Sequence, residues 1–103
     1  MTDQELFGKT GIKKCVIEEI ILLAQKYDVQ KVILFGSRAR GDFKLRSDID
    51  LAFQGGNRNR FIVAVEEETS TLLQFDIIDL NNPVQSELLE SIKCEGIILY
   101  EKI

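Results

Sequence analysis

Two short stretches of the sequence carry residues that could bind a metal ion and a phosphate group. Asp48 and Asp50 are separated by one residue, so on a strand both carboxylates face the same side, with Cα atoms about 6.5 to 7 Å apart. Such a pair of hard oxygen ligands suits Mg²⁺, although an isolated pair is also typical of a solvent-facing strand. Gly36 and Ser37 directly follow an apolar run, where backbone N–H groups and a hydroxyl can hold phosphate oxygens.

Further charged residues extend both candidate sites. Arg38 and Arg40 follow Ser37 and could add charge-assisted hydrogen bonds to a phosphate, although glycine and serine before a helix also form an ordinary capped turn. The segment 74–80 offers a third carboxylate, from either Asp76 or Asp79. These two have opposite strand parity, so only one of them can share a face with Asp48 and Asp50. A third carboxylate from Asp76 would allow two metal ions.

The composition excludes several classes of function. The chain has no histidine, which removes zinc-finger spacing, Ser-His triads and Cys-His dyads. A net charge of −4 argues against stable binding of nucleic acid. The longest aliphatic run, 20–24, is too short for a signal peptide or a membrane span, so we expect a cytoplasmic protein without a membrane partner. Basic residues gather in the segment 38–60, where they suit a small anion.

Apolar periodicity predicts alternating helices and strands, and therefore an α/β or α+β layer structure. With 103 residues and 45% hydrophobic content, we expect one domain over residues 1–103. The helices are expected over 12–27, in a short turn over 37–40, after Asn57 and from about 83 to Gly96, and the strands over 32–35, 48–53, 74–80 and 97–100.

Three local features of these elements follow from the pattern. Cys15 lies beside the apolar stripe of the first helix and is interpreted as a small core residue rather than a redox group. Leu72 is expected to point inward at the end of the helix that follows Asn57. Asn82 is expected to cap the next helix, with Pro83 at its first position and Gln85 returning a capping hydrogen bond.

The order of the motifs resembles a known signature. Gly36-Ser37, the ten residues 38–47, the Asp48-Ile49-Asp50 triplet and a later hydrophobic-Asp-hydrophobic strand at Asp76 resemble the DNA polymerase β nucleotidyltransferase superfamily. Within it, the segments 36–42 and 47–51 look like the minimal nucleotidyltransferase group. The resemblance covers residues 32–100.

The resemblance implies a fold and a reaction. It implies a central mixed sheet of about four strands flanked by helices, with Gly36 and Ser37 holding the triphosphate of ATP or another nucleoside triphosphate. Asp48 and Asp50 would bind Mg²⁺, and the third carboxylate would help to bind the catalytic metal and accept the proton of the attacking hydroxyl. That hydroxyl attacks the α-phosphorus, and pyrophosphate leaves.

The resemblance also implies a partner. Larger relatives carry a helical domain that completes the acceptor pocket, and we expect this chain to lack one. Minimal nucleotidyltransferases commonly act beside a separate helical HEPN protein, as an antitoxin that AMPylates or blocks a HEPN ribonuclease toxin. We therefore expect AMP transfer to a hydroxyl of a HEPN-type partner.

Two alternatives belong to other classes of function. One is a non-catalytic nucleotide-binding module that neutralises its partner by contact alone. The other is a stand-alone transferase that modifies a small molecule in a pocket completed by a homodimer. The unbalanced carboxylates of Asp48, Asp50 and Asp76 favour the enzyme, because a module that binds by contact has no need of them.

Overall fold

A computed structural model describes residues 8–102 of the chain. Helices and strands alternate, as the sequence predicts. In chain order they are α2 (Lys14–Lys26), β1 (Lys31–Phe35), α3 (Ser37–Arg40), β2 (Ile49–Gln54), α4 (Arg58–Glu68), β3 (Phe75–Asp79), α5 (Ser86–Glu95) and β4 (Ile97–Glu101). Within residues 8–102, no helix is both long and apolar enough to span a membrane.

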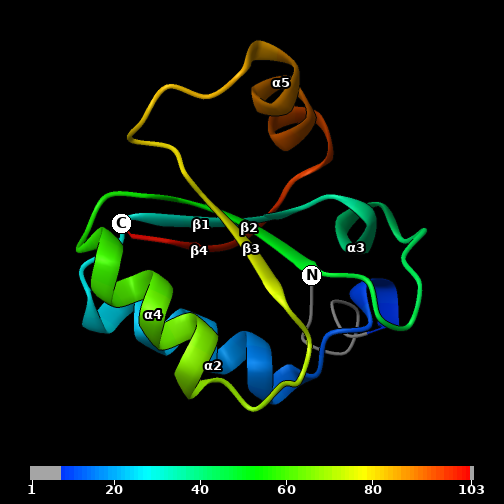
Figure 1. Cartoon of the computed structure of the whole chain (residues 1–103), viewed down its shortest axis with the longest axis horizontal. Coiled ribbons are helices and arrows are strands. Elements are labelled where there is room, and N and C mark those ends of the chain that lie inside the picture. The colour runs from blue at the N-terminus through cyan, green and yellow to red at the C-terminus, as the bar shows by residue number, and fades with distance from the viewer. Residues whose placement is uncertain (1–7, 103) are drawn as a thin grey trace.

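The four strands form one mixed sheet in the order β3-β2-β1-β4. β1 runs antiparallel to both β2 and β4, whereas β2 and β3 are parallel. Helices α2 and α4 cover one face of the sheet, α5 lies over the other, and α3 sits at one end (Figure 1). The expected mixed sheet flanked by helices is confirmed.

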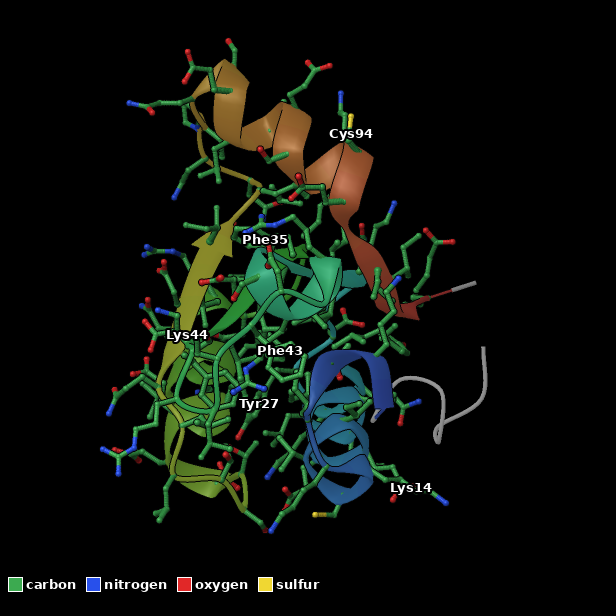
Figure 2. All side chains as sticks on the ribbon, turned by 90° about the vertical axis from the view of Figure 1, so that its right-hand side faces the viewer. Lys14, Tyr27, Phe35, Phe43, Lys44 and Cys94 are labelled. Carbon is green, nitrogen blue, oxygen red and sulfur yellow. The ribbon has the colours of Figure 1, made fainter. Side chains whose placement is uncertain are left out.

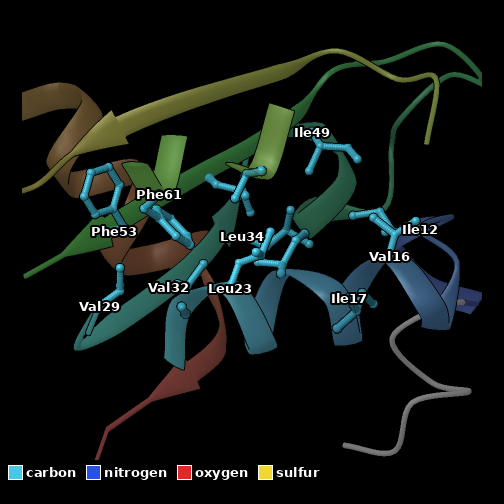
Figure 3. Packing of buried hydrophobic residues seen from close by; sticks show 14 of the residues in the cluster. Ile12, Val16, Ile17, Leu23, Val29, Val32, Leu34, Ile49, Phe53 and Phe61 are labelled. Carbon is cyan, nitrogen blue, oxygen red and sulfur yellow. The ribbon is translucent and has the colours of Figure 1, made fainter. Parts of the chain in front are cut away.

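The main core lies between the sheet and the pair α2 and α4. The α2 residues that recur at helical spacing are buried here, as predicted, and the rings of Phe53 and Phe61 pack 5.2 Å apart between β2 and α4 (Figure 3). Burying a large apolar side chain stabilises a fold by roughly 1.5 to 3 kcal/mol, so this cluster is the principal source of stability.

A smaller cluster holds α5 against the opposite face. Phe35, Ala52 and Ile92 are buried together there. Because side chains alternate along a strand, Leu51 points into the main core while its neighbours Asp50 and Ala52 point to the α5 face. The side of the sheet on which the carboxylates stand therefore follows from the burial of Leu51.

Helix α5 begins later than the sequence predicts. Its N-cap is Gln85 and its first residue is Ser86, so Asn82 does not cap it and Pro83 lies outside it. Asn82 is drawn into a turn that follows β3, where its side chain donates to Asp79 at 3.4 Å and its backbone N–H to the Asp79 carbonyl at 3.3 Å. The polar groups expected to cap the helix thus close a turn instead.

Two predictions of burial are also wrong. Cys15 is exposed, because Val16 and Ile17 turn toward the sheet and leave it on the outer side of α2. Leu72 is fully exposed, because α4 ends at Glu68, where the Thr69 hydroxyl donates to the Val65 carbonyl at 2.7 Å. Beyond that point the helical periodicity no longer decides which side chains face inward.

Candidate functional site

Three carboxylates stand where β2 and β3 begin. The parallel register pairs Asp50 of β2 with Asp76 of β3, and Asp48 immediately precedes β2. The core-facing partners Leu51 and Ile77 fix both aspartates on the α5 face. Adjacent strands lie about 4.8 Å apart, so the two carboxylates are close neighbours. The expected grouping of Asp76 with Asp48 and Asp50 is what the strand pairing produces.

The electrostatics at Asp50 reflect this crowding. Burial, the largest cause, and the negative charges of Asp76 and Asp48 together raise its pKa to about 6, while the positive charge of Arg40 opposes the shift. A raised pKa means that the folded protein disfavours the ionised carboxylate. A bound cation would favour the ionised carboxylates instead, because its positive charge attracts all three and offsets their mutual repulsion.

Gly36 links β1 to α3 in a backbone conformation that only glycine adopts readily, with φ 76° and ψ −157°. A Cβ atom at this position would collide with the carboxylate of Asp50. The glycine therefore lets an acidic side chain approach the turn at which phosphate is expected. Asp50 is thus the group that approaches the backbone at Gly36.

Ser37 begins α3 beside this contact. Its carbonyl accepts hydrogen bonds from the backbone N–H groups of Gly41 at 2.9 Å and Asp42 at 3.1 Å, which closes the turn. Within residues 8–102 its hydroxyl makes no hydrogen bond, and the side chain is half-buried. The hydroxyl is therefore available to a ligand.

Arg40 lies on the exposed side of α3. Its guanidinium pairs with Asp42 at 3.2 Å and with Glu95, at the end of α5, at 2.9 Å. These two carboxylates raise its pKa, with Glu95 the larger cause. Glu95 lies 55 positions away in the sequence, so no local signal could have identified it as a partner.

Arg38 has a different position from the one expected. Its side chain is 2% exposed, and its guanidinium donates to the backbone carbonyls of Thr10 at 2.9 Å, Ser47 at 3.0 Å and Leu45 at 3.1 Å. The guanidinium also lies 4.8 Å from the ring centroid of Phe43, a residue visible beside α3 in Figure 2. Burial lowers its pKa.

These contacts commit Arg38 to the protein itself. All its hydrogen bonds hold the loop 41–48, which leads into Asp48, against the segment that precedes α2. The phosphate contact expected of Arg38 is therefore corrected to a structural role. No sequence pattern indicates this role, because the backbone carbonyls that accept from Arg38 can belong to any residue type.

Asp79 is separate from the other carboxylates. It lies on the α4 face, where its side chain is 7% exposed and pairs with Arg58 at 2.9 Å. It also accepts hydrogen bonds from the backbone and side-chain amides of Asn81, at 2.9 and 2.8 Å. Asp79 therefore closes the turn after β3 and does not face the candidate site.

The donor set fits a loosely held magnesium ion. Among residues 8–102, no three side chains of His, Cys, Asp or Glu are arranged to hold a metal ion together. Mg²⁺ is usually bound by one or two carboxylates and takes its other ligands from water and phosphate. Asp48 and Asp50 meet that requirement, and the repulsion at Asp50 is the condition that a cation relieves.

Comparison with known proteins gives one family. A family model described as polymerase β nucleotidyltransferase matches residues 18–103. A protein of Methanocaldococcus jannaschii, whose name describes a candidate protein adenylyltransferase, is 37% identical over 79 residues, which span 75% of this chain and 76% of that protein.

Solved structures share the fold. A toxin–antitoxin complex with AMP-PNP matches with a TM-score of 0.64 at 23% identity, over 84% of this chain and 73% of that one. A variant of the toxin–antitoxin MntA–HpeT matches with a TM-score of 0.66 at 21% identity, over the same shares of 84% and 73%. A candidate nucleotidyltransferase of Sulfolobus solfataricus gives 0.56 at 21% identity, over 96% and 86%.

Proposed function

The chain belongs to the polymerase β nucleotidyltransferase family, and from that premise we propose that it transfers AMP from ATP to a hydroxyl group of a partner protein. The observation that carries the proposal is the meeting of Asp48, Asp50 and Asp76 beside a glycine whose side-chain space Asp50 fills. A structural set of aspartates would be hydrogen-bonded, as Asp79 is, whereas Asp50 is held against the charges of its neighbours.

Each residue of the site has a role in this reaction. The backbone N–H groups after Gly36 and the hydroxyl of Ser37 hold the triphosphate, and Arg40 adds a positive charge at its side. Asp48 and Asp50 hold Mg²⁺, in one or two ions; when bound, the metal neutralises phosphate charge and favours deprotonation of the attacking hydroxyl.

Asp76 orients the acceptor hydroxyl and receives its proton. The acceptor oxygen forms a bond to the α-phosphorus, the bond from that phosphorus to the bridging oxygen breaks, and pyrophosphate leaves with the electron pair. Without histidine in the chain, a carboxylate is the side chain best suited to act as this base. The open face of Asp76, an exposed residue on an edge strand, leaves room for an acceptor on another molecule.

The acceptor belongs to a helical HEPN-type protein, with this chain as the antitoxin of the pair. The resemblance of residues 36–51 to minimal nucleotidyltransferases supports this pairing, and so does the shared fold with toxin–antitoxin proteins. In the described structure Asp48 and Asp76 are exposed, so a partner can reach them.

One experiment tests the proposal. The purified chain is mixed with α-labelled ATP, Mg²⁺ and a helical HEPN-type protein, and label on that protein is measured on a denaturing gel. Transfer is expected from wild type and not from Asp50→Asn. A non-catalytic module would bind the partner tightly without labelling it, and that result would overturn the proposed activity while keeping the partnership.

A further inference from the structure

Two leucines are left uncovered beside the candidate site. Leu45 is 88% exposed and Leu72 is fully exposed, and both line one hollow of about 540 Å³. We call it the Leu45–Leu72 hollow; it is lined by Leu45, Arg46, Leu72, Leu73 and Gln74. Single exposed leucines are common, but two that share a concave surface mark a binding region more often.

The hollow adjoins the carboxylates. The backbone N–H of Ile49 donates to the carbonyl of Gln74 at 2.9 Å, which joins the two loops that form the hollow. Gln74 lies two residues before Asp76, and Arg46 lies two residues before Asp48. The hollow therefore lies next to the start of the site.

The rim of the hollow is positively charged. Arg46 lines it, Lys44 precedes Leu45, and both side chains are exposed and make no ion pair within residues 8–102. A second hollow of about 380 Å³ shares Leu72 and Leu73 with the first and is lined by the exposed Lys13. The chain as a whole has a net charge of −4, so this concentration of positive charge is local.

We propose that the Leu45–Leu72 hollow docks an acidic segment of the acceptor protein, with one apolar side chain seated between the two leucines. The inference rests on the proposed function and names the surface that presents the acceptor. The carboxylates of Asp48 and Asp76 repel acidic residues, so the acidic part of the segment lies over Lys13 and Arg46. Its hydroxyl residue then extends over Asp76.

The chemistry of the lining favours a protein segment over RNA. Unpaired bases bind mainly by stacking on aromatic side chains, and the residues that line the hollow include none. Leucine side chains are instead covered by other aliphatic groups. The basic rim gives the segment its orientation and speeds its approach, as charged rims do at protein interfaces.

The test uses fluorescein-labelled peptides of about ten residues, long enough at ~3.3 Å per residue to reach from the hollow to the carboxylates. The probe contains several acidic residues, one leucine and one hydroxyl residue, which is Ser, Thr or Tyr in three versions. Matched peptides replace the acidic residues with lysine, or the leucine with serine. Binding is measured by fluorescence anisotropy without ATP or metal, on the whole chain.

The variants compare exposed leucines inside and outside the hollow. The double variant Leu45→Ser/Leu72→Ser is expected to bind the acidic probe roughly tenfold or more weakly, because it loses its apolar anchors. Leu22→Ser, in a leucine 63% exposed on α2, is expected to leave binding unchanged. Arg46→Glu should lower the affinity for the acidic probe and raise the affinity for the lysine probe. Thermal melts verify that all these variants fold.

Several results would overturn the proposal. Equal binding of the acidic and lysine probes would contradict the role of charge. An equal loss of affinity in Leu22→Ser would contradict the role of the hollow. Tighter binding of a labelled single-stranded RNA would make the surface a nucleic-acid site. A dimer in sedimentation that the Leu45 and Leu72 changes dissociate would make it a self-contact. If the acidic probe binds as expected in this metal-free assay but the partner protein acquires no label in the transfer assay with ATP and Mg²⁺, the transferase proposal fails and the docking surface stands.

Discussion

The carboxylate of Asp50 fills the space in which a side chain on residue 36 would begin. Gly36 is thus required twice, once for its backbone conformation with φ 76° and once for the absence of a Cβ atom. The contact joins the turn after β1, the proposed phosphate site, to strand β2, which carries the proposed metal ligands. Motifs separated by ten residues in the sequence are in this way parts of a single site.

Gly36→Ala is expected to destabilise the fold by about 2 to 4 kcal/mol and to abolish ATP binding, because strain and collision add together. Gly41→Ala is the matched control. It also has a positive φ, of 92°, but its new Cβ would meet only the Lys9 carbonyl at 3.8 Å, so only strain remains, at about 1 kcal/mol. Urea melts and calorimetry with ATP measure the two effects. Equal losses in both variants would refute the role of the Asp50 contact.

The stability of the metal-free protein should depend on the charge of Asp50. Its folded-state pKa of about 6 lies above the ordinary value of 3.8, so the stabilising contribution is complete below the ordinary value and is lost as the pH rises through 6. The expected loss is about 1 kcal/mol, less than the full shift implies, because water reaches part of the side chain. Denaturant melts from pH 4 to pH 7 in chelator measure it.

Asp50→Asn should remove that pH-dependent step, melt at a higher temperature than wild type in chelator at pH 7, and abolish transfer. Mg²⁺ with ATP should stabilise wild type but not the variant. Asp48→Asn should also abolish transfer with a smaller gain in stability, since Asp48 is exposed. A large loss of melting temperature in either variant would mean that the carboxylate holds the fold.

Asp76 and Asp79 should respond to the same substitution in opposite ways. Asp76→Asn is expected to remain folded and to lose transfer to the partner. Asp79→Asn is expected to keep transfer and lose about 1 to 3 kcal/mol of stability, because it weakens the contact with Arg58 and the turn after β3. Paired measurements of labelling and of urea midpoints decide this. Activity that persists in Asp76→Asn and disappears in a folded Asp79→Asn would reverse the assignment.

Arg38→Met should act on stability. Methionine has a similar length but no donors, so the carbonyls of Thr10, Leu45 and Ser47 lose their partner, at about 2 to 4 kcal/mol in total. Arg38→Lys should recover only part of this, because an ammonium lacks the planar fork of a guanidinium and stacks less well on Phe43. Unfolding in guanidinium chloride measures the stability of each variant. Unchanged stability with weaker ATP binding would restore Arg38 as a phosphate ligand.

Glu95→Gln tests whether Arg40 serves the nucleotide. Glu95 holds the Arg40 guanidinium at 2.9 Å and so competes with a phosphate for it. An exposed ion pair contributes about 0.2 to 1 kcal/mol, so its removal should tighten ATP binding by up to about fivefold. Arg40→Gln should weaken ATP binding in the same calorimetric assay. Glu101→Gln, which loses an ion pair with Lys31, is the control for a change in net charge. Weaker ATP binding in Glu95→Gln would contradict this role.

Much of the fold and of the site follows from the sequence. The alternation of apolar residues along β2 places Asp48 and Asp50 opposite the core, and parity alone separates Asp76 from Asp79. Both results rest on the two-residue period of a strand, which a sequence displays directly. The buried strand β1 and the glycine that ends it are local in the same sense.

The tertiary structure decided what depends on distant partners. Arg38 and Arg40 are two residues apart and chemically alike. Arg38 is buried against backbone carbonyls, whereas Arg40 pairs with Glu95 at the end of α5. Asn82 bonds to Asp79 in a turn and does not cap α5, and Leu72 is exposed because α4 ends before it. Periodicity specifies which face a side chain takes on its own element. The partners of a side chain depend on how elements far apart in the chain pack together. No local sequence pattern shows which side chain a backbone carbonyl or an exposed acid will contact.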